Sequence, residues 1–144
     1  MDAFFRKLRV IEDCYSKLSD LKRENPSFEH YQKSWKDKDS VERNLQKVIE
    51  AIVDLGKLII IEKKLPEPGN NREIFQILIE ASYFPEKLYS LTDQMLGMRN
   101  ILVHGYDKVD DEIVYGIVKK HLKDIRTIKN TYEALVNKLA SRKG

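Results

Sequence analysis

The chain has 144 residues, of which 42% are hydrophobic and 34% are charged, so it is long enough for a hydrophobic core and too apolar to be disordered. Its single cysteine, Cys14, excludes an internal disulfide and a cysteine-rich zinc site. The formal net charge of +3 is too small to identify a nucleic-acid-binding protein by itself. We therefore expect one domain that spans residues 1–144.

No apolar run approaches the length needed to cross a bilayer, so we expect no membrane association. Residues 1–6 lack the basic and apolar regions of a signal peptide. Together with the lone cysteine, this predicts a reducing, cytoplasmic location.

Apolar residues in the first half follow a helical period. One face of a first helix is formed by residues spaced three and four apart, namely Leu8, Ile11, Tyr15, Leu18 and Leu21. The pair Asn25-Pro26 should end this helix, because the residue before a proline avoids the helical region. Ser27 is expected to cap a short second helix that carries Trp35. A capping box over residues 39–42 would then open a long third helix.

The second half continues the helical pattern after a loop over residues 65–70. Asn70 and Glu73 have the spacing of a second capping box, and Gly105 should end the helix that follows. Asp110 can cap the last helix. The apolar stripe expected on that helix consists of Ile113, Ile117, Leu122, Ile125, Ile128, Tyr132, Leu135 and Leu139.

No segment shows the alternation of a strand, and the sequence has no internal repeat. Long helical segments joined by short connections are typical of bundles. The sequence therefore predicts an all-α fold, an up-and-down bundle of four to five main helices.

Polar residues gather from Arg99 to Tyr106, at the end of an otherwise apolar helix. Asn100 and His104 are four residues apart and share a helical face. Arg99 precedes His104 by five residues, so the two side chains diverge on an unbroken helix. They can converge if the helix ends near His104, or across the two-fold axis of a dimer.

This set of residues suits metal-independent cleavage of RNA, in which the ribose 2′-OH attacks the adjacent phosphate. A histidine can serve as the base or the acid at neutral pH, and a guanidinium stabilises the negative charge of the transition state. A symmetric dimer would supply two such histidines. From spacing alone, a structural role is the more common explanation, because an arginine and a histidine near a helix end also neutralise the last carbonyls.

The pattern Arg-x-x-x-x-His-x-Tyr, formed by Arg99, His104 and Tyr106, resembles the signature of HEPN proteins of the HepT type. Asn100 directly after the arginine also fits that family, as do the segment at residues 39–43 and the loop rich in glycine and proline. The likeness therefore extends over the whole chain.

The resemblance implies an RNA endonuclease that acts as the toxin of a prokaryotic, type VII-like toxin–antitoxin pair. It implies a homodimer whose motifs meet in a cleft, with Arg99 and His104 catalytic and Asn100 supporting, and no metal or other cofactor. It also implies a minimal nucleotidyltransferase antitoxin that neutralises the toxin by transferring AMP to Tyr106. In such a dimer the end of the fifth helix should lie near the axis, with Met95, Met98 and Ile101 exposed around the motif.

Two other functions remain open. The same bundle could be a non-catalytic HEPN subunit that docks a nucleotidyltransferase. A nucleotide-sensing or DNA-binding regulator is less favoured, because the charge is modest and no helix-turn-helix spacing appears. Residues 119–144 hold eight lysines and arginines against two acidic residues, which indicates a solvated helix face more than a phosphate-binding surface. His30 and His121 are expected to be surface or packing residues.

Overall fold

The computed structural model describes residues 1–105 and 109–143, with the side chain of Lys143 excepted. Within these ranges the chain is helical and contains no strand, which confirms the predicted all-α bundle. None of the described helices is long and apolar enough to cross a membrane. In chain order the elements are α1 (Asp2–Glu24), α2 (Phe28–Lys33), α3 (Trp35–Glu62), α4 (Asn71–Glu80), the 3₁₀ helix η1 (Glu86–Leu88), α5 (Tyr89–His104) and α6 (Asp111–Lys143).

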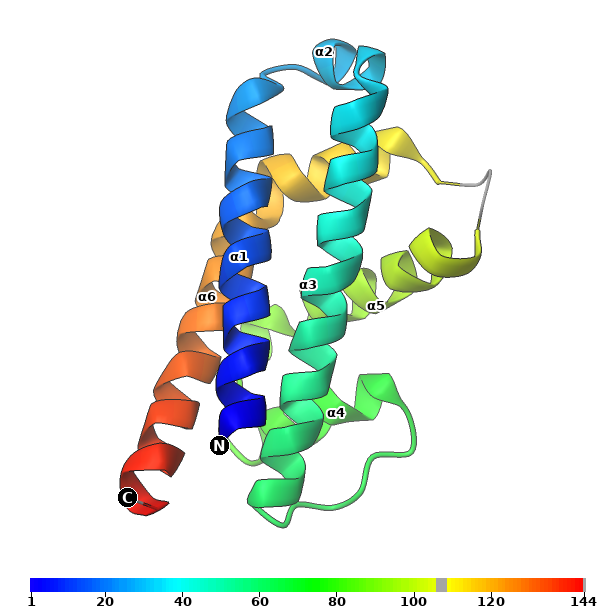
Figure 1. The fold of residues 1–144 in the computed structure, drawn as a ribbon. Coiled ribbons are helices and arrows are strands. Elements are labelled where there is room, and N and C mark those ends of the chain that lie inside the picture. The colour runs from blue at the N-terminus through cyan, green and yellow to red at the C-terminus, as the bar shows by residue number, and fades with distance from the viewer. Residues whose placement is uncertain (106–108, 144) are drawn as a thin grey trace.

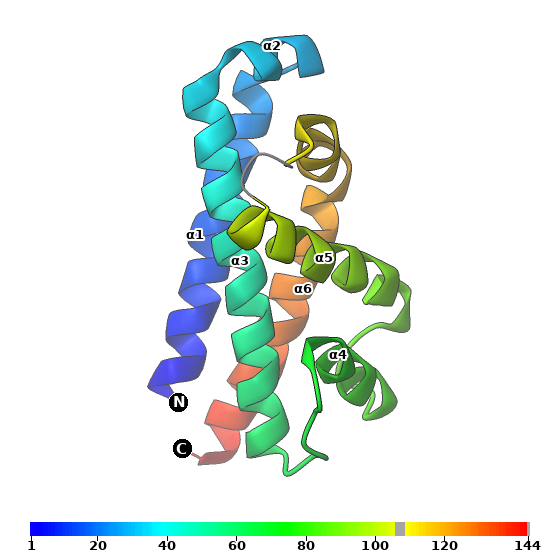
Figure 2. The same ribbon diagram turned by 90° about the vertical axis from the view of Figure 1, so that its right-hand side faces the viewer.

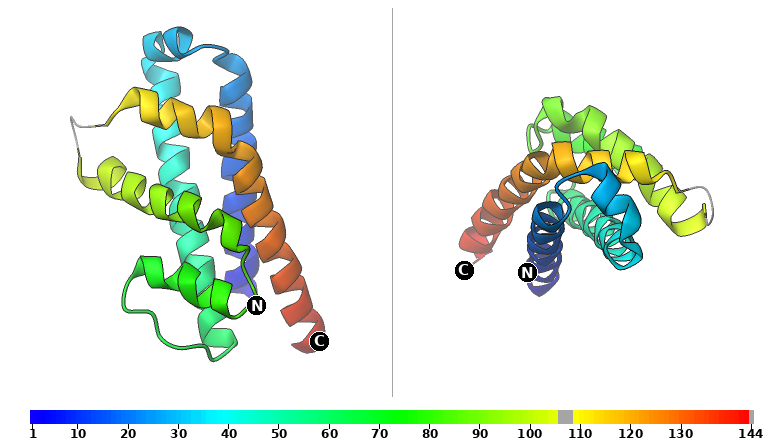
Figure 3. Two further views of the ribbon diagram at one scale, coloured as in Figure 1. Left: turned by 180° about the vertical axis from the view of Figure 1, so that it is seen from behind. Right: turned by 90° about the horizontal axis from the view of Figure 1, so that it is seen from above.

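Helix α1 makes the most extensive contacts of the bundle, with α3 and with α6 (Figures 1 and 3). Helices α4 and α5 contact α3 and each other, and they lie across α3 rather than along it (Figures 1 and 2). Helix α6 first crosses the bundle and then bends to run beside α1 (Figure 3). Because α5 lies across α3, its C-terminal end projects away from α1, toward the edge of the molecule (Figure 1).

Three predicted helix starts are confirmed by side-chain caps. The Ser27 hydroxyl accepts a hydrogen bond from the N–H of His30 at 3.1 Å, and the Asn70 carbonyl oxygen accepts one from the N–H of Glu73 at 3.0 Å. Asp110 Oδ1 accepts hydrogen bonds from two N–H groups in the first turn of α6, at 2.9 and 3.3 Å. Such caps satisfy backbone donors that have no partner inside the helix, so a local signal in the sequence fixes each start.

The predicted start of the long third helix is wrong. Helix α3 begins at Trp35, and the Ser34 hydroxyl caps it by accepting a hydrogen bond from the N–H of Asp37 at 3.3 Å. The capping box predicted at residues 39–42 therefore lies inside α3. Trp35 belongs to α3 and not to α2, and it is 66% exposed. Ser34 has an extended backbone conformation and caps the helix first, so the capping box at residues 39–42 is not needed to begin it.

Helix α6 is anchored to the core by two tyrosines. The Tyr132 hydroxyl is fully buried and donates a hydrogen bond to the Ile52 carbonyl of α3 at 2.9 Å. The Tyr115 hydroxyl donates to the Asn25 carbonyl, also at 2.9 Å. Because Tyr115 and its neighbour Val114 face the core, Ile113 points outward and is 50% exposed, contrary to its predicted place in the buried stripe.

The remaining members of the predicted α6 stripe are buried or half-buried, as expected. Cys14 is buried in the core. Burial raises the pKa of its thiol, so the thiol stays protonated and unreactive.

Candidate functional site

Helix α5 carries three of the four residues singled out by the sequence. Arg99 and Asn100 lie in its C-terminal half and His104 is its last residue. The fourth, Tyr106, lies outside the described residues. Gly105 ends the helix, and its N–H donates to the Ile101 carbonyl at 2.7 Å. A Cβ on Gly105 would lie 2.5 Å from that carbonyl oxygen, so only glycine fits this helix end without a shift of the backbone.

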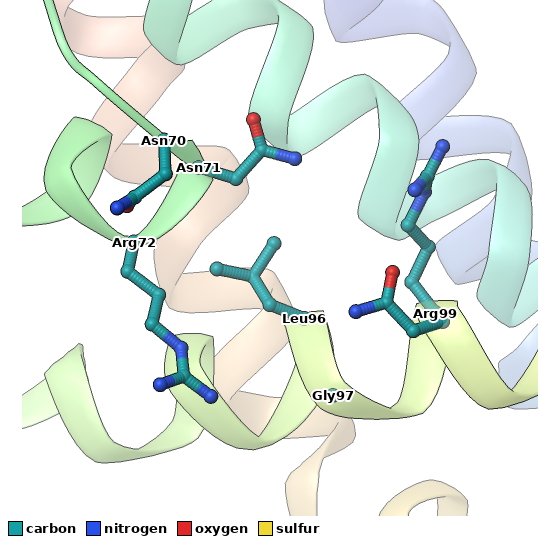
Figure 4. A pocket seen from close by; sticks show the side chains of 7 residues that line it. Asn70, Asn71, Arg72, Leu96, Gly97 and Arg99 are labelled. Atoms are coloured by element: carbon teal, nitrogen blue, oxygen red, sulfur yellow. The ribbon is translucent and has the colours of Figure 1, made fainter.

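Arg99 reaches back from α5 to α3, where its Nε lies 3.7 Å from Oε1 of Glu50. Both side chains are about one-third exposed, at 32% and 38%. Glu50 Oε1 also accepts a hydrogen bond from Nε2 of Gln46 at 3.3 Å. The Arg99 contact is an ion pair rather than a hydrogen bond at this distance. It nevertheless directs the guanidinium toward α3 (Figure 4).

Arg99 and His104 do not converge through the end of the helix. Because α5 is helical through His104, five residues of about 100° each turn the two side chains roughly 140° apart. Arg99 faces α3, whereas Asn100 and His104 are both exposed. Of the two arrangements considered from the sequence, convergence within one chain is therefore not observed.

Two of the three apolar residues expected to be exposed around the motif are buried. Met95 is 2% exposed and Met98 is 6% exposed, because the face of α5 that carries them packs against the core. Ile101, by contrast, is 44% exposed, as expected. Helical spacing alone could not show which face of α5 the cross-packed α3 and α4 would cover.

A pocket of about 370 Å³ lies beside Arg99, between the first turn of α4 and the middle of α5 (Figure 4). Its walls consist of Asn70, Asn71, Arg72, Leu96, Gly97, Arg99 and Asn100. Arg72 is held by an ion pair of its Nε with Oδ1 of Asp93 at 2.8 Å. The pocket thus joins two of the predicted site residues to residues of α4 that the sequence did not single out.

The sequence reasoning also missed Glu50. A detectable signal existed, because Glu50 interrupts the apolar run from Val48 to Val53 and such a charge usually has a partner. Asn71 and Arg72 gave no such signal, since only the packing of α4 against α5 brings them near Arg99.

The other two histidines make local contacts. Nδ1 of His30 lies 3.0 Å from Oδ1 of Asn25, and Nδ1 of His121 lies 2.9 Å from Oδ2 of Asp124. His30 is exposed and His121 half-buried, in agreement with the predicted surface or packing role. Within the described ranges, no group of three or more histidine, cysteine or acidic side chains is placed to hold a metal ion.

The cross-packed helical bundle, with an Arg-x-x-x-x-His motif at the end of α5, is the architecture of a HEPN-type domain. The chain is similar to the tri-AMPylated HEPN toxin of Shewanella oneidensis, solved in complex with an MNT antitoxin. The TM-score is 0.82 and the identity 26%, over 93% of this chain and 98% of that one.

A family model described as Ribonuclease HepT-like matches residues 11–131, so the chain belongs to the HepT-like ribonuclease family. It is 27% identical to the mRNA nuclease HepT of Shewanella oneidensis, over 92% of this chain and 98% of that protein. It is 31% identical to the tRNA nuclease HepT of Aphanizomenon flos-aquae, over 68% of this chain and 67% of that protein.

Proposed function

We propose that this protein is a metal-independent RNA endonuclease and the toxin of a type VII-like toxin–antitoxin pair. Its membership of the HepT-like family and its similarity to two proteins named as RNA nucleases support this proposal. The observation that carries it is the position of Arg99, Asn100 and His104 on one helix whose end projects from the bundle. There, the side chains can reach a polymeric substrate.

In the proposed reaction, the ribose 2′-oxygen attacks the adjacent phosphorus as a base removes its proton. The bond from phosphorus to the 5′-oxygen breaks, and an acid protonates that oxygen as it leaves. The products are a 2′,3′-cyclic phosphate and a free 5′-hydroxyl, so no water is consumed. His104 performs the proton transfers, because imidazole exchanges protons near neutral pH. Arg99 stabilises the charge that develops on the phosphoryl oxygens, and Asn100 supports the substrate beside it.

We infer that two copies of the chain form the active unit. Within one chain α5 directs Arg99 and His104 to different faces, so a second copy is the remaining way to bring the two groups together. Large apolar side chains are exposed on α5 near the motif and on the first turn of α6, namely Ile101 and Ile113. Burial of these side chains between copies would stabilise a symmetric dimer. Two histidines would then be available, one for each proton transfer.

The regulatory part of the proposal concerns Tyr106, which follows His104 by two residues in the sequence. We infer that a minimal nucleotidyltransferase in the same cytoplasm transfers AMP to its hydroxyl. The support is the similarity to a HEPN toxin that is tri-AMPylated and bound to an MNT antitoxin. A phosphate bound next to His104 would bring negative charge to the place where the substrate phosphate binds, and it would thereby block cleavage.

The experiment that tests this function is RNA cleavage in EDTA by protein produced without the antitoxin. An intact mass that shows no AMP adduct is the starting condition. Wild type should cleave single-stranded RNA, and His104→Ala should lose about 10²–10⁴-fold in rate. Arg99→Lys should retain only a small part of the activity, because lysine keeps the charge but not the guanidinium fork.

The control is Arg9→Ala, which removes an exposed arginine from α1 and should leave the rate unchanged. Unmodified wild type that leaves RNA intact would instead support the alternative function, a non-catalytic subunit that docks a nucleotidyltransferase.

A further inference from the structure

The pocket beside Arg99 has the size and the lining of a ligand site. Its volume of about 370 Å³ falls in the range of about 300–1,000 Å³ that is usual for small-molecule sites. Resting on the function proposed above, we propose that this pocket binds one nucleotide of the RNA, the one adjacent to the cleaved phosphodiester. Arg72, Asn71 and Gly97 then become substrate-binding positions outside the Arg-x-x-x-x-His motif.

Two arginines face this pocket from different helices. Arg72 on α4 pairs through Nε with Asp93 at 2.8 Å, and Arg99 on α5 pairs through Nε with Glu50 at 3.7 Å. An ion pair through Nε holds one edge of a guanidinium and leaves its terminal nitrogens as donors toward a ligand. The pocket therefore has two oriented guanidinium groups on its wall, one from α4 and one from α5.

Each arginine is partly neutralised by its carboxylate. The two arginines and their two carboxylates sum to zero net charge, so the free guanidinium donors, and not a net positive potential, would bind the single negative charge of a phosphodiester. With Arg99 at the cleaved phosphate, a free terminal nitrogen of Arg72 would contact the next phosphate along the strand. The polymer would thus be held on both sides of one nucleotide.

The remaining polar groups suit a nucleobase. Asn71 and Asn100 each carry an amide with a donor and an acceptor, which is the pattern that reads the edges of bases. The side chain of Asn70 is already engaged as the cap of α4. Leu96 adds an apolar wall between the two arginines, against which the face of a base can lie (Figure 4).

Gly97 is a helical glycine on the wall of this pocket. No close approach within the chain requires it, because a Cβ at Gly97 would meet no atom within 4 Å. The residue lines the pocket, and a side chain at this position would occupy the volume that we assign to the nucleotide.

The test uses Gly97→Phe, which fills the pocket. Arg72→Ala removes one cation group, and Arg9→Ala on α1 is the matched arginine control. For cleavage of a fluorescent single-stranded RNA of mixed sequence, Arg72→Ala should raise KM about tenfold, the effect of a lost hydrogen bond to a charged group. Gly97→Phe should raise KM at least as much, because its ring would occupy the space assigned to the nucleotide. Their kcat should stay within about twofold, since the groups bind a part of the substrate that does not react. Arg9→Ala should match wild type.

An unchanged KM in both Gly97→Phe and Arg72→Ala would overturn the pocket proposal while leaving the nuclease function standing. If Gly97→Phe proves unfolded by circular dichroism, the KM of Arg72→Ala decides. If wild type cleaves no RNA, the nuclease function fails, and a titration with mixed ribonucleoside 5′-monophosphates then decides the pocket separately. Amide NMR shifts at Asn71 and Asn100 that Gly97→Phe abolishes would support nucleotide binding, and absent shifts in wild type would refute it.

Discussion

Arg99 and Glu50 form an ion pair between α5 and α3, with Nε and Oε1 3.7 Å apart and both side chains about one-third exposed. Glu50 is itself held by Gln46, one turn earlier on α3. At this exposure the pair contributes at most about 1 kcal/mol to stability. Its main effect is therefore on the direction of the guanidinium, which makes Glu50 a positioning residue for Arg99.

We expect Glu50→Ala to lower kcat for RNA cleavage by about tenfold, because a guanidinium that is no longer oriented stabilises the transition state less well. KM should change little, and Glu50→Gln should recover much of the lost rate because it keeps an acceptor oxygen. The control is Asp54→Ala, which breaks an ion pair of similar exposure with Lys7 at 3.0 Å on the α1 side of α3. Equal losses in Glu50→Ala and Asp54→Ala would show a structural effect only.

Tyr106→Phe should retain at least partial cleavage and escape the antitoxin, because it removes only the hydroxyl that accepts AMP. The measurement is growth and intact mass after co-expression with the nucleotidyltransferase. A Tyr106→Phe protein that is still silenced and still gains AMP would show that another tyrosine is modified. Tyr83 would then be examined before Tyr115, because the Tyr115 side chain is 7% exposed and its hydroxyl is bonded to the Asn25 carbonyl.

The proposed dimer should dissociate when a charge is placed on its exposed apolar residues. Ile101→Asp and Ile113→Asp should each shift the mass in light scattering from about twice 16.9 kDa to the single-chain value, while helicity is retained. Ile61→Asp is the matched control, because Ile61 is also exposed, at 73%, but lies at the C-terminal end of α3. A wild-type protein with the single-chain mass at micromolar concentrations would rule out the dimer.

Gly56 should be a sensitive glycine in the core of the bundle. A Cβ there would lie 2.7 Å from Cγ2 of Ile74 and 3.1 Å from the Tyr132 hydroxyl oxygen, where α3, α4 and α6 meet. Gly56→Ala should therefore reduce the free energy of unfolding in urea by about 1–3 kcal/mol. Gly97→Ala, which meets no atom, should raise it by about 0.5–1 kcal/mol. Equal midpoints for the two variants would contradict this account of Gly56.

Local signals in the sequence predicted the fold class and most helix boundaries. Ser27, Asn70 and Asp110 each satisfy nearby backbone donors, so their effect does not depend on tertiary packing. One error was local, because Ser34 caps α3 ahead of the predicted capping box. The others concern properties that packing decides. Met95 and Ile113 lie on helices whose covered face depends on how α5 and α6 cross the long helices, and helical period alone does not specify that crossing.

The same distinction applies to the candidate site. Arg99, Asn100 and His104 could be selected because they are adjacent in the chain and resemble a family motif. Glu50 and Arg72 enter the site from other helices, at separations that no periodic pattern relates to Arg99. Burial supplied no further guide, because both of these side chains remain partly exposed.

The divergence of Arg99 and His104 around α5 has a consequence for gene dosage. If each complete site takes its arginine from one copy and its histidine from another, isolated chains are inert. Below the dissociation constant of the dimer, the number of active sites then rises with the square of the expression level. A low background level of the toxin would thus cleave little RNA, whereas a modest increase in its expression would cause a disproportionate loss of RNA.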